Sequence, residues 1–127
     1  MKKTIIAFGV LFSVLISTAH ANVFNNDKPR TIKTTSSNVA PLSLAVAEND
    51  YNTVKRFLEL GADIEVKEKT MGMTPLMYAA RYNNVQLLEL LVANGANVEE
   101  VSKMGFTALK YAEMSNATDA VSFLQNL

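Results

Sequence analysis

Apolar positions in the middle of the chain follow a helical period in two short segments that are separated by a pair of asparagines. This pattern predicts one helix from Thr74 to about Tyr82 and a second from about Val85 to Ala93. Gly95 suits the end of the second helix. Helices this short cannot bury their apolar faces alone, so they must stack on neighbours. The inward positions are expected to be Leu76, Ala79 and Ala80 in the first helix, and Leu87, Leu88 and Leu91 in the second.

The same pattern occurs three times along the chain. Residues 40–65 (APLSLAVAENDYNTVKRFLELGADIE) align without a gap with residues 74–99 (TPLMYAARYNNVQLLELLVANGANVE) at an offset of 34 positions. A shorter third copy, TALKYAEMSNATDAVSFLQNL, occupies residues 107–127 at an offset of 33. Repeats that bury their apolar faces only against each other are typical of a solenoid. We therefore predict an all-α solenoid of about three helix-turn-helix repeats, at residues 39–72, 73–105 and 106–127.

These residues resemble the ankyrin repeat family, in which a period of about 33 residues carries a TPLHxAA helix opening and a GAD or GAN turn. The resemblance covers residues 39–127 and implies short β-hairpin-like finger loops between the repeats. Ser43, Met77 and Lys110 stand where the family has histidine, which removes a hydrogen bond that steadies the loop. The first and third copies depart further from the pattern and are expected to cap the stack. The matching residues are Thr74, Pro75, Leu76, Ala79 and Ala80 of the opening, and Gly61, Ala62, Asp63, Gly95, Ala96 and Asn97 of the turn.

The N-terminus has the three regions of a secretory signal peptide. Two lysines precede an apolar run from Thr4 to Ser17, and a small-residue ending predicts cleavage after Ala21. The run is shorter than the ~20 residues of a membrane-spanning helix. No cysteine follows that could carry a lipid anchor. We therefore expect a signal peptide at residues 1–21, a flexible leader at residues 22–38, and a location in the periplasm without membrane insertion.

Charge and composition exclude several classes of function. The chain has 12 basic and 12 acidic residues, no cysteine, and a single histidine, His20, within the predicted signal. Loss of Lys2 and Lys3 with the signal leaves a net charge of about −2, which is too balanced for nucleic acid or an anionic membrane as partner. Without histidine or cysteine, neither a nucleophilic triad nor an imidazole or thiolate zinc site can form. We expect a protein that is not an enzyme and that has no cofactor and no metal site.

The family resemblance implies that a protein partner binds the finger tips and the inner face of each first helix. Mapped onto this sequence, the partner-binding positions are Thr70, Met71, Met73, Arg81, Tyr82, Lys103, Met104, Phe106 and Met114. Two interpretations remain open. Met73 and Phe106 fold back and complete a thin core, or they belong to an exposed apolar patch that marks a protein interface. The basic residues that would surround such a patch are Lys67, Lys69, Arg81 and Lys103.

Small exported proteins of this family resemble the immunity proteins that bacteria keep in the periplasm against toxins such as lipases and peptidoglycan hydrolases. The resemblance therefore implies an inhibitor or immunity-type protein that binds and neutralises a partner enzyme or toxin. A rigid concave face suits the covering of an active-site mouth, because rigidity lowers the ordering cost of binding. The alternative is a structural or accessory scaffold for an envelope enzyme or assembly. We expect a monomer when the protein is free.

Overall fold

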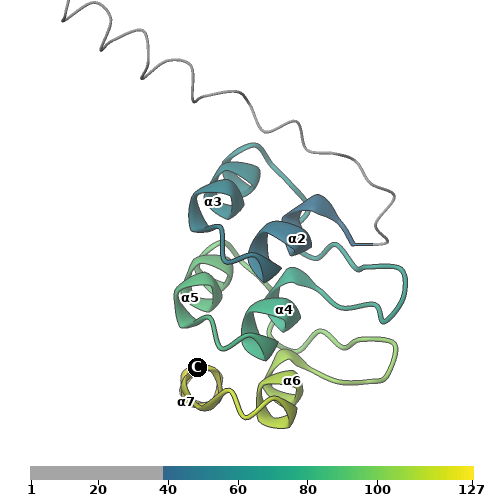
Figure 1. Cartoon of the computed structure of the whole chain (residues 1–127), viewed down its shortest axis with the longest axis vertical. Helices are drawn as coiled ribbons and strands as arrows, with labels where there is room; N and C mark the ends of the chain where they lie inside the picture. Colours follow the sequence, from purple (N-terminus) through teal and green to yellow (C-terminus); the bar gives the residue numbers. More distant parts are fainter. Residues whose placement is uncertain (1–38) are drawn as a thin grey trace, which may run out of the picture. The chain divides into compact units, whose positions relative to one another are not determined.

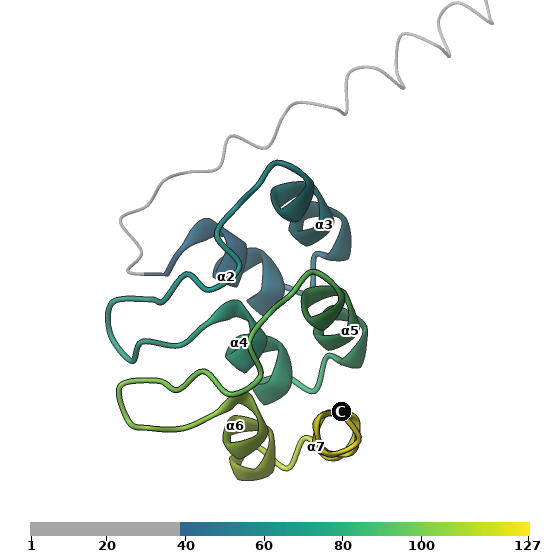
Figure 2. The ribbon, with the colours of Figure 1, turned by 180° about the vertical axis from the view of Figure 1, so that it is seen from behind.

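The computed structural model describes residues 39–127, which form three pairs of short α-helices. The predicted signal peptide and leader lie outside the described residues. Figures 1 and 2 show the pairs stacked in chain order, with α2, α4 and α6 in one layer and α3, α5 and α7 in the other. The prediction of an all-α solenoid of three helix-turn-helix repeats is confirmed. The pairs are α2 (Pro41–Ala47) with α3 (Tyr51–Glu59), α4 (Pro75–Arg81) with α5 (Val85–Ala93), and α6 (Ala108–Met114) with α7 (Thr118–Gln125).

Polar side chains start both helices of the central pair. The Thr74 hydroxyl accepts a hydrogen bond from the Met77 N–H at 3.4 Å, and the Asn84 side chain accepts one from the Leu87 N–H at 3.1 Å. Each cap satisfies a backbone donor that has no partner inside the helix. Both helices therefore begin and end within about one residue of the predicted positions. Caps of the same kind start α3 and α6, from Asp50 and Thr107.

An asparagine in the left-handed conformation turns the chain between the two helices of each pair. Asn49, Asn83 and Asn116 have φ values between 54° and 56°, which asparagine tolerates better than most residues with a Cβ. Asn83 also connects two repeats. Its Oδ1 accepts from the Ala120 N–H at 2.9 Å, and its Nδ2 donates to the Asp119 carboxylate at 3.3 Å. The turn of the second repeat thus holds the first turn of α7 in the third.

The core lies along α4. Ala79 and Ala80 are fully buried, and their small side chains allow α2 and α6 to pack against α4. All six inward positions predicted for the central repeat are buried. At the end of the stack, Glu113 occupies the repeat position that is equivalent to Val46 and Ala80. Those two residues are buried, whereas Glu113 is exposed. The polar residues expected to cap the last repeat are all exposed, namely Lys110, Glu113, Thr118, Asp119 and Ser122.

The three residues that replace the family's histidine differ in their environments. The Met77 sulfur, a weak acceptor, takes a hydrogen bond from the Thr74 N–H at 3.4 Å. Lys110 is exposed. Ser43 is fully buried on α2, and its Oγ has no hydrogen-bond partner among the described residues. A buried hydroxyl without a partner destabilises the folded state.

Ser43→Ala is therefore expected to stabilise the protein by about 1 kcal/mol more than Ser122→Ala does. Both serines lie in helices, so both substitutions gain the same helix propensity, but Ser122 is exposed. The difference between the two variants isolates the buried hydroxyl. Urea unfolding followed by circular dichroism measures both free energies. A Ser43→Ala variant less stable than Ser122→Ala would contradict the absence of a partner.

Two finger loops extend from the stack beside α4 and α6 (Figure 1). We define finger 1 as residues 66–73 and finger 2 as residues 100–106. In finger 1 the Glu68 N–H donates to the Met73 carbonyl at 3.1 Å, and in finger 2 the Ser102 N–H donates to the Phe106 carbonyl at 3.0 Å. No strand is assigned anywhere in residues 39–127, so each finger is a hairpin-like turn closed by a backbone hydrogen bond.

The two fingers are also bonded to each other. The Lys103 N–H donates to the Met71 carbonyl at 3.0 Å, and the Lys67 ammonium lies 2.6 Å from a Glu100 carboxylate oxygen. Gly72 adopts a φ of +68° and is buried where Lys103 of finger 2 packs against finger 1. A Cβ at this position would lie 2.9 Å from Lys103 Cγ. The close contact of the fingers therefore depends on the missing side chain of Gly72.

Candidate functional site

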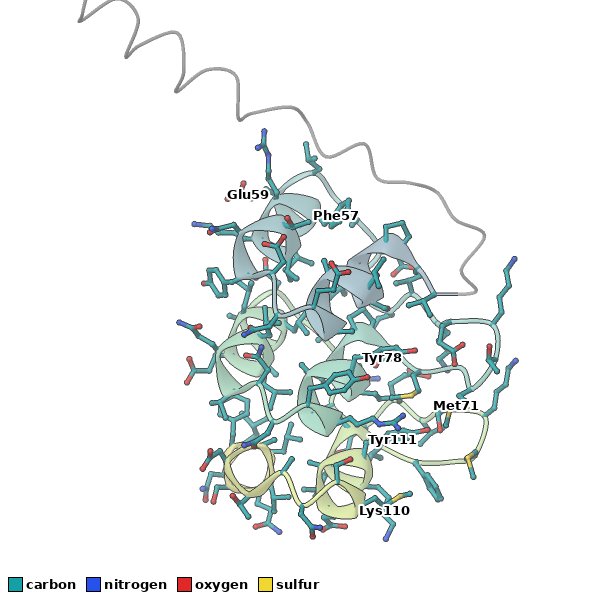
Figure 3. All side chains as sticks on the ribbon, in the orientation of Figure 1. Phe57, Glu59, Met71, Tyr78, Lys110 and Tyr111 are labelled. Atoms are coloured by element: carbon teal, nitrogen blue, oxygen red, sulfur yellow. The ribbon has the colours of Figure 1, made fainter. Side chains whose placement is uncertain are left out.

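A cavity of about 190 Å³ opens between the fingers and the helices α4 and α6. Five of its lining residues belong to the predicted partner-binding set. These five come from four separate segments of the chain, namely finger 1, α4, finger 2 and α6. Figure 3 shows Met71 of finger 1 on the same side of the stack as Tyr78 and Tyr111. We call this feature the finger cavity. Its lining residues are Met71, Arg81, Met104, Phe106, Tyr111, Met114 and Ser115.

The inner wall of the finger cavity is aromatic and held in place. Tyr111 of α6 is buried, and its hydroxyl donates to Ser102 Oγ at 2.9 Å. The half-buried Phe106 ring meets the Tyr111 ring edge-on, with centroids 5.9 Å apart and an interplanar angle of 75°. Edge-on packing is a favourable arrangement of two aromatic rings. The side chain of Ser102 thus connects the base of finger 2 to α6.

The rim of the finger cavity is formed by flexible apolar side chains. Met104 and Met114 are 60% and 57% exposed, and Met71 of the same lining is half-buried. Methionine adapts its shape to a partner more readily than branched side chains do. Exposed methionines beside an aromatic wall form the kind of apolar patch that marks an interaction site.

Four of the predicted binding residues do not line the finger cavity. Met73 is only 1% exposed and belongs to the buried core, because the end of finger 1 returns to the start of α4. Its assignment to the binding surface is therefore wrong, and the interpretation that it completes the core is confirmed. Tyr82 is 54% exposed but lines a different depression, of about 240 Å³, together with Val46 and Asn49. Thr70 and Lys103 are exposed on the fingers but do not line the finger cavity.

Tyr78 of α4 lines neither the finger cavity nor the depression beside Tyr82. Its ring stacks on Tyr82 with centroids 6.5 Å apart and an interplanar angle of 19°. Burial raises the pKa of Tyr78, and the negative charge of Glu68 adds to the increase. Leu44 and Tyr111 occupy the equivalent positions in the other repeats. Of these three residues only Tyr111 lines the finger cavity, and it is absent from the predicted partner-binding set.

Glu68 organises finger 1 from inside. The side chain is only 4% exposed, and its two oxygens accept from the N–H groups of Thr70 at 2.6 Å, Met73 at 3.4 Å, and Met71. Burial alone would raise the pKa of Glu68, but these backbone donors outweigh it and hold the pKa below its ordinary value. Finger 2 has Ser102 at the equivalent position, so no repeated motif indicated this role.

Positively charged side chains lie in the lining of the finger cavity and on the fingers. Arg81 lines it, and Lys69 and Lys103 are exposed on the fingers. Within residues 39–127, none of these three cations lies within ion-pair distance of a carboxylate. The Lys103 ammonium instead donates to the backbone carbonyls of Lys69 and Thr70. The site therefore offers apolar contact and uncompensated positive charge.

Neither a metal centre nor a membrane span is evident in the described part of the chain. Across residues 39–127, no three His, Cys, Asp or Glu side chains are grouped so that they could hold a metal ion. None of the helices in this range has the length and apolar character needed to cross a bilayer.

Stacked helix pairs with paired fingers define the class of this molecule as a helical repeat protein. Residues 42–126 match the family model of ankyrin repeats, in three copies. The chain therefore belongs to the ankyrin repeat family, whose repeats form protein–protein interaction modules.

Known proteins similar to this chain are mostly longer. The crystal structure of the ankyrin repeat domain of Bcl-3 superimposes with a TM-score of 0.65 at 32% identity, over 69% of this chain and 39% of that one. A putative ankyrin repeat protein of Rickettsia bellii is 30% identical over 100 residues, 74% of this chain and 59% of the relative. The phosphodiesterase gde1 of Schizosaccharomyces pombe is 40% identical over 77 residues, which are 61% of this chain but only 7% of gde1. The chain spans less than two thirds of each, so the activity that the name of gde1 states is not carried over.

Proposed function

We propose that this protein is a non-enzymatic binding module of the periplasm, which binds one protein at the finger cavity and inhibits it in the manner of an immunity protein. The main support is the finger cavity itself, where an aromatic wall, three methionines and an arginine meet on the surface. Methionine, arginine and aromatic residues are enriched at protein interfaces. The proposed location rests on the signal-peptide pattern of residues 1–21.

The rigidity of the fingers favours tight binding. Glu68 braces finger 1, Ser102 connects finger 2 to α6, and the Lys103 N–H joins the two fingers through the Met71 carbonyl. A surface that is already ordered loses less conformational entropy when a partner binds. An inhibitor benefits from this more than a transient scaffold does, because it must remain bound.

Replacing both rim methionines, in Met104→Ser with Met114→Ser, is expected to weaken partner binding by about tenfold or more. The partner is first captured with the wild-type protein from cell-envelope extract, identified by mass spectrometry and purified. Affinities are then measured by calorimetry. The matched control is Leu60→Ser with Leu127→Ser, which removes two exposed apolar side chains that do not line the finger cavity.

The outcomes separate the parts of the proposal. Loss of the partner's activity on stoichiometric addition supports an inhibitor, whereas unchanged activity with altered abundance in a deletion strain supports a scaffold. Equal affinities for the rim and control variants would exclude the finger cavity as the binding site. Recovery of the full-length, uncleaved chain from the cytoplasmic fraction would contradict the periplasmic location.

A further inference from the structure

We propose that the partner inserts one large apolar side chain into the finger cavity and that acidic residues beside this anchor pair with Arg81 and the finger lysines. The occupant is thus an acidic protein segment with a single apolar anchor. This inference rests on the proposed function and adds the chemistry of the partner. It follows from the size of the cavity, its lining and the charge around it.

The size of the cavity selects the kind of ligand. At about 190 Å³ it is smaller than the ~300–1,000 Å³ of small-molecule and cofactor sites. A space of this size accommodates one apolar or aromatic side chain, the usual anchor of a protein interface. Phe106 and Tyr111, packed edge-on, provide an aromatic wall for the anchor, and Met71, Met104 and Met114 complete the lining.

The charge near the cavity is positive although the repeats as a whole are acidic. Residues 39–127 contain seven basic and eleven acidic side chains. Five of the seven basic residues lie in the fingers, α4 and α6, and the other two, Lys55 and Arg56, lie on α3. A partner complementary to the net charge of the domain would be basic. The charge near the finger cavity is positive, so a partner that binds there is expected to be acidic.

Carboxylates in the same elements do not cancel this positive charge. Glu68 is buried and bonded to three backbone N–H groups, and Glu100 pairs with Lys67 at 2.6 Å. Glu113 of α6 takes the repeat position that faces the open end of the stack. Arg81 alone combines a place in the cavity lining with a guanidinium that has no carboxylate partner in the described chain. Its planar donors suit bidentate binding of a carboxylate.

The carboxylates at the bases of the loops are engaged or lie elsewhere. Asp63 accepts from the Glu65 N–H at 2.9 Å, and Glu65 accepts from the Asn97 N–H at 2.6 Å. Glu99 lines a separate depression beside Leu124 of α7. The finger cavity therefore has an apolar interior and a positive edge, which is complementary to an acidic segment with an apolar anchor.

A phage-displayed library of random linear peptides, selected on the protein isolated from cells that express the full chain, tests this inference. Selected peptides are expected to share one Leu, Met, Phe or Trp flanked by at least two Asp or Glu. Arg81→Glu is expected to weaken the best synthetic peptide by about tenfold or more. Lys55→Glu on α3 makes the same charge change away from the cavity and is expected to change binding less than about twofold.

A variant of the peptide keeps the test decisive if Arg81→Glu alters folding. Replacing its acidic residues by Asn and Gln, with wild-type protein, is expected to produce the same tenfold loss. A consensus without acidic residues, an unchanged affinity for the Asn and Gln peptide, or no enrichment overturns the inference. If such peptides still lose binding in the Met104→Ser, Met114→Ser variant, the finger cavity remains the binding site. If the peptides and the captured partner bind both the Arg81→Glu variant and the Met104→Ser, Met114→Ser variant with wild-type affinity, the proposed function is overturned as well.

Discussion

Glu68→Ala is expected to destabilise the protein by about 2–4 kcal/mol, because three backbone N–H groups of finger 1 lose their acceptor at once. The N–H of Met73 is buried and cannot form a hydrogen bond with water instead. Because Met71 is one of the three donors and also lines the finger cavity, partner binding should weaken together with stability. Urea unfolding measures the first effect and calorimetry with the captured partner the second. A free energy of unfolding within about 0.5 kcal/mol of wild type would show that Glu68 does not brace the finger.

The same carboxylate predicts how stability depends on pH. The pKa of Glu68 is lower in the folded protein than in the unfolded chain, where it is about 4.3. The stabilisation is therefore complete above about pH 4.3 and declines as the pH falls through the lower, folded pKa. Glu68→Gln should lose about 1–3 kcal/mol at pH 7 but lose less at pH 3, so that the two stability curves converge in acid. Glu59→Gln, which removes an exposed carboxylate of α3, is the matched control.

Gly72→Ala is expected to destabilise the protein by about 2–3 kcal/mol, more than any other glycine substitution in the fingers. The new Cβ would meet Lys103 Cγ at 2.9 Å and Lys103 N at 3.2 Å, in addition to the strain of a positive φ. Gly105→Ala is the matched control, because Gly105 has a φ of +77° with no atom within 4 Å of the added Cβ. The Gly105→Ala substitution should lower the free energy of unfolding by only about 1 kcal/mol.

The difference between the two glycine variants measures the contact between the fingers. Denaturant unfolding of both proteins under one set of conditions provides the comparison. Amide hydrogen exchange adds a local readout, because the Lys103 N–H bonded to the Met71 carbonyl should lose protection in Gly72→Ala and keep it in Gly105→Ala. Equal destabilisation by the two substitutions would mean that the fingers can separate without cost.

Much of the candidate site could be predicted from the sequence, because the repeat aligns the fingers with one another. The alignment placed Met71 and Met104 on adjacent fingers, and Arg81 and Met114 on adjacent helices, and the structure brings all four together. Tyr82 belongs to the predicted set because it is one of the two positions that follow Ala79 and Ala80. On a helix, neighbouring residues point about 100° apart, and Tyr82 therefore lines the next depression.

The local sequence determined the helices of this protein. Thr74 and Asn84 cap their own helices, Asn83 turns the chain, and the spacing of Leu87, Leu88 and Leu91 defines an apolar face. Each of these effects acts within four residues along the chain, which is why the sequence pattern alone was sufficient.

The tertiary structure alone decided which finger side chains face inward. Met71 and Met73 are two residues apart in a loop without periodicity, yet one lines the finger cavity and the other lies in the core. Two contacts separate the directions of Met71 and Met73. These are the hydrogen bonds to Glu68 and the close packing of Lys103 against Gly72. Both depend on how the chain folds back and how the next repeat packs against it. A loop has no intrinsic direction for its side chains, so only its packing partners determine which of them a binding partner can reach.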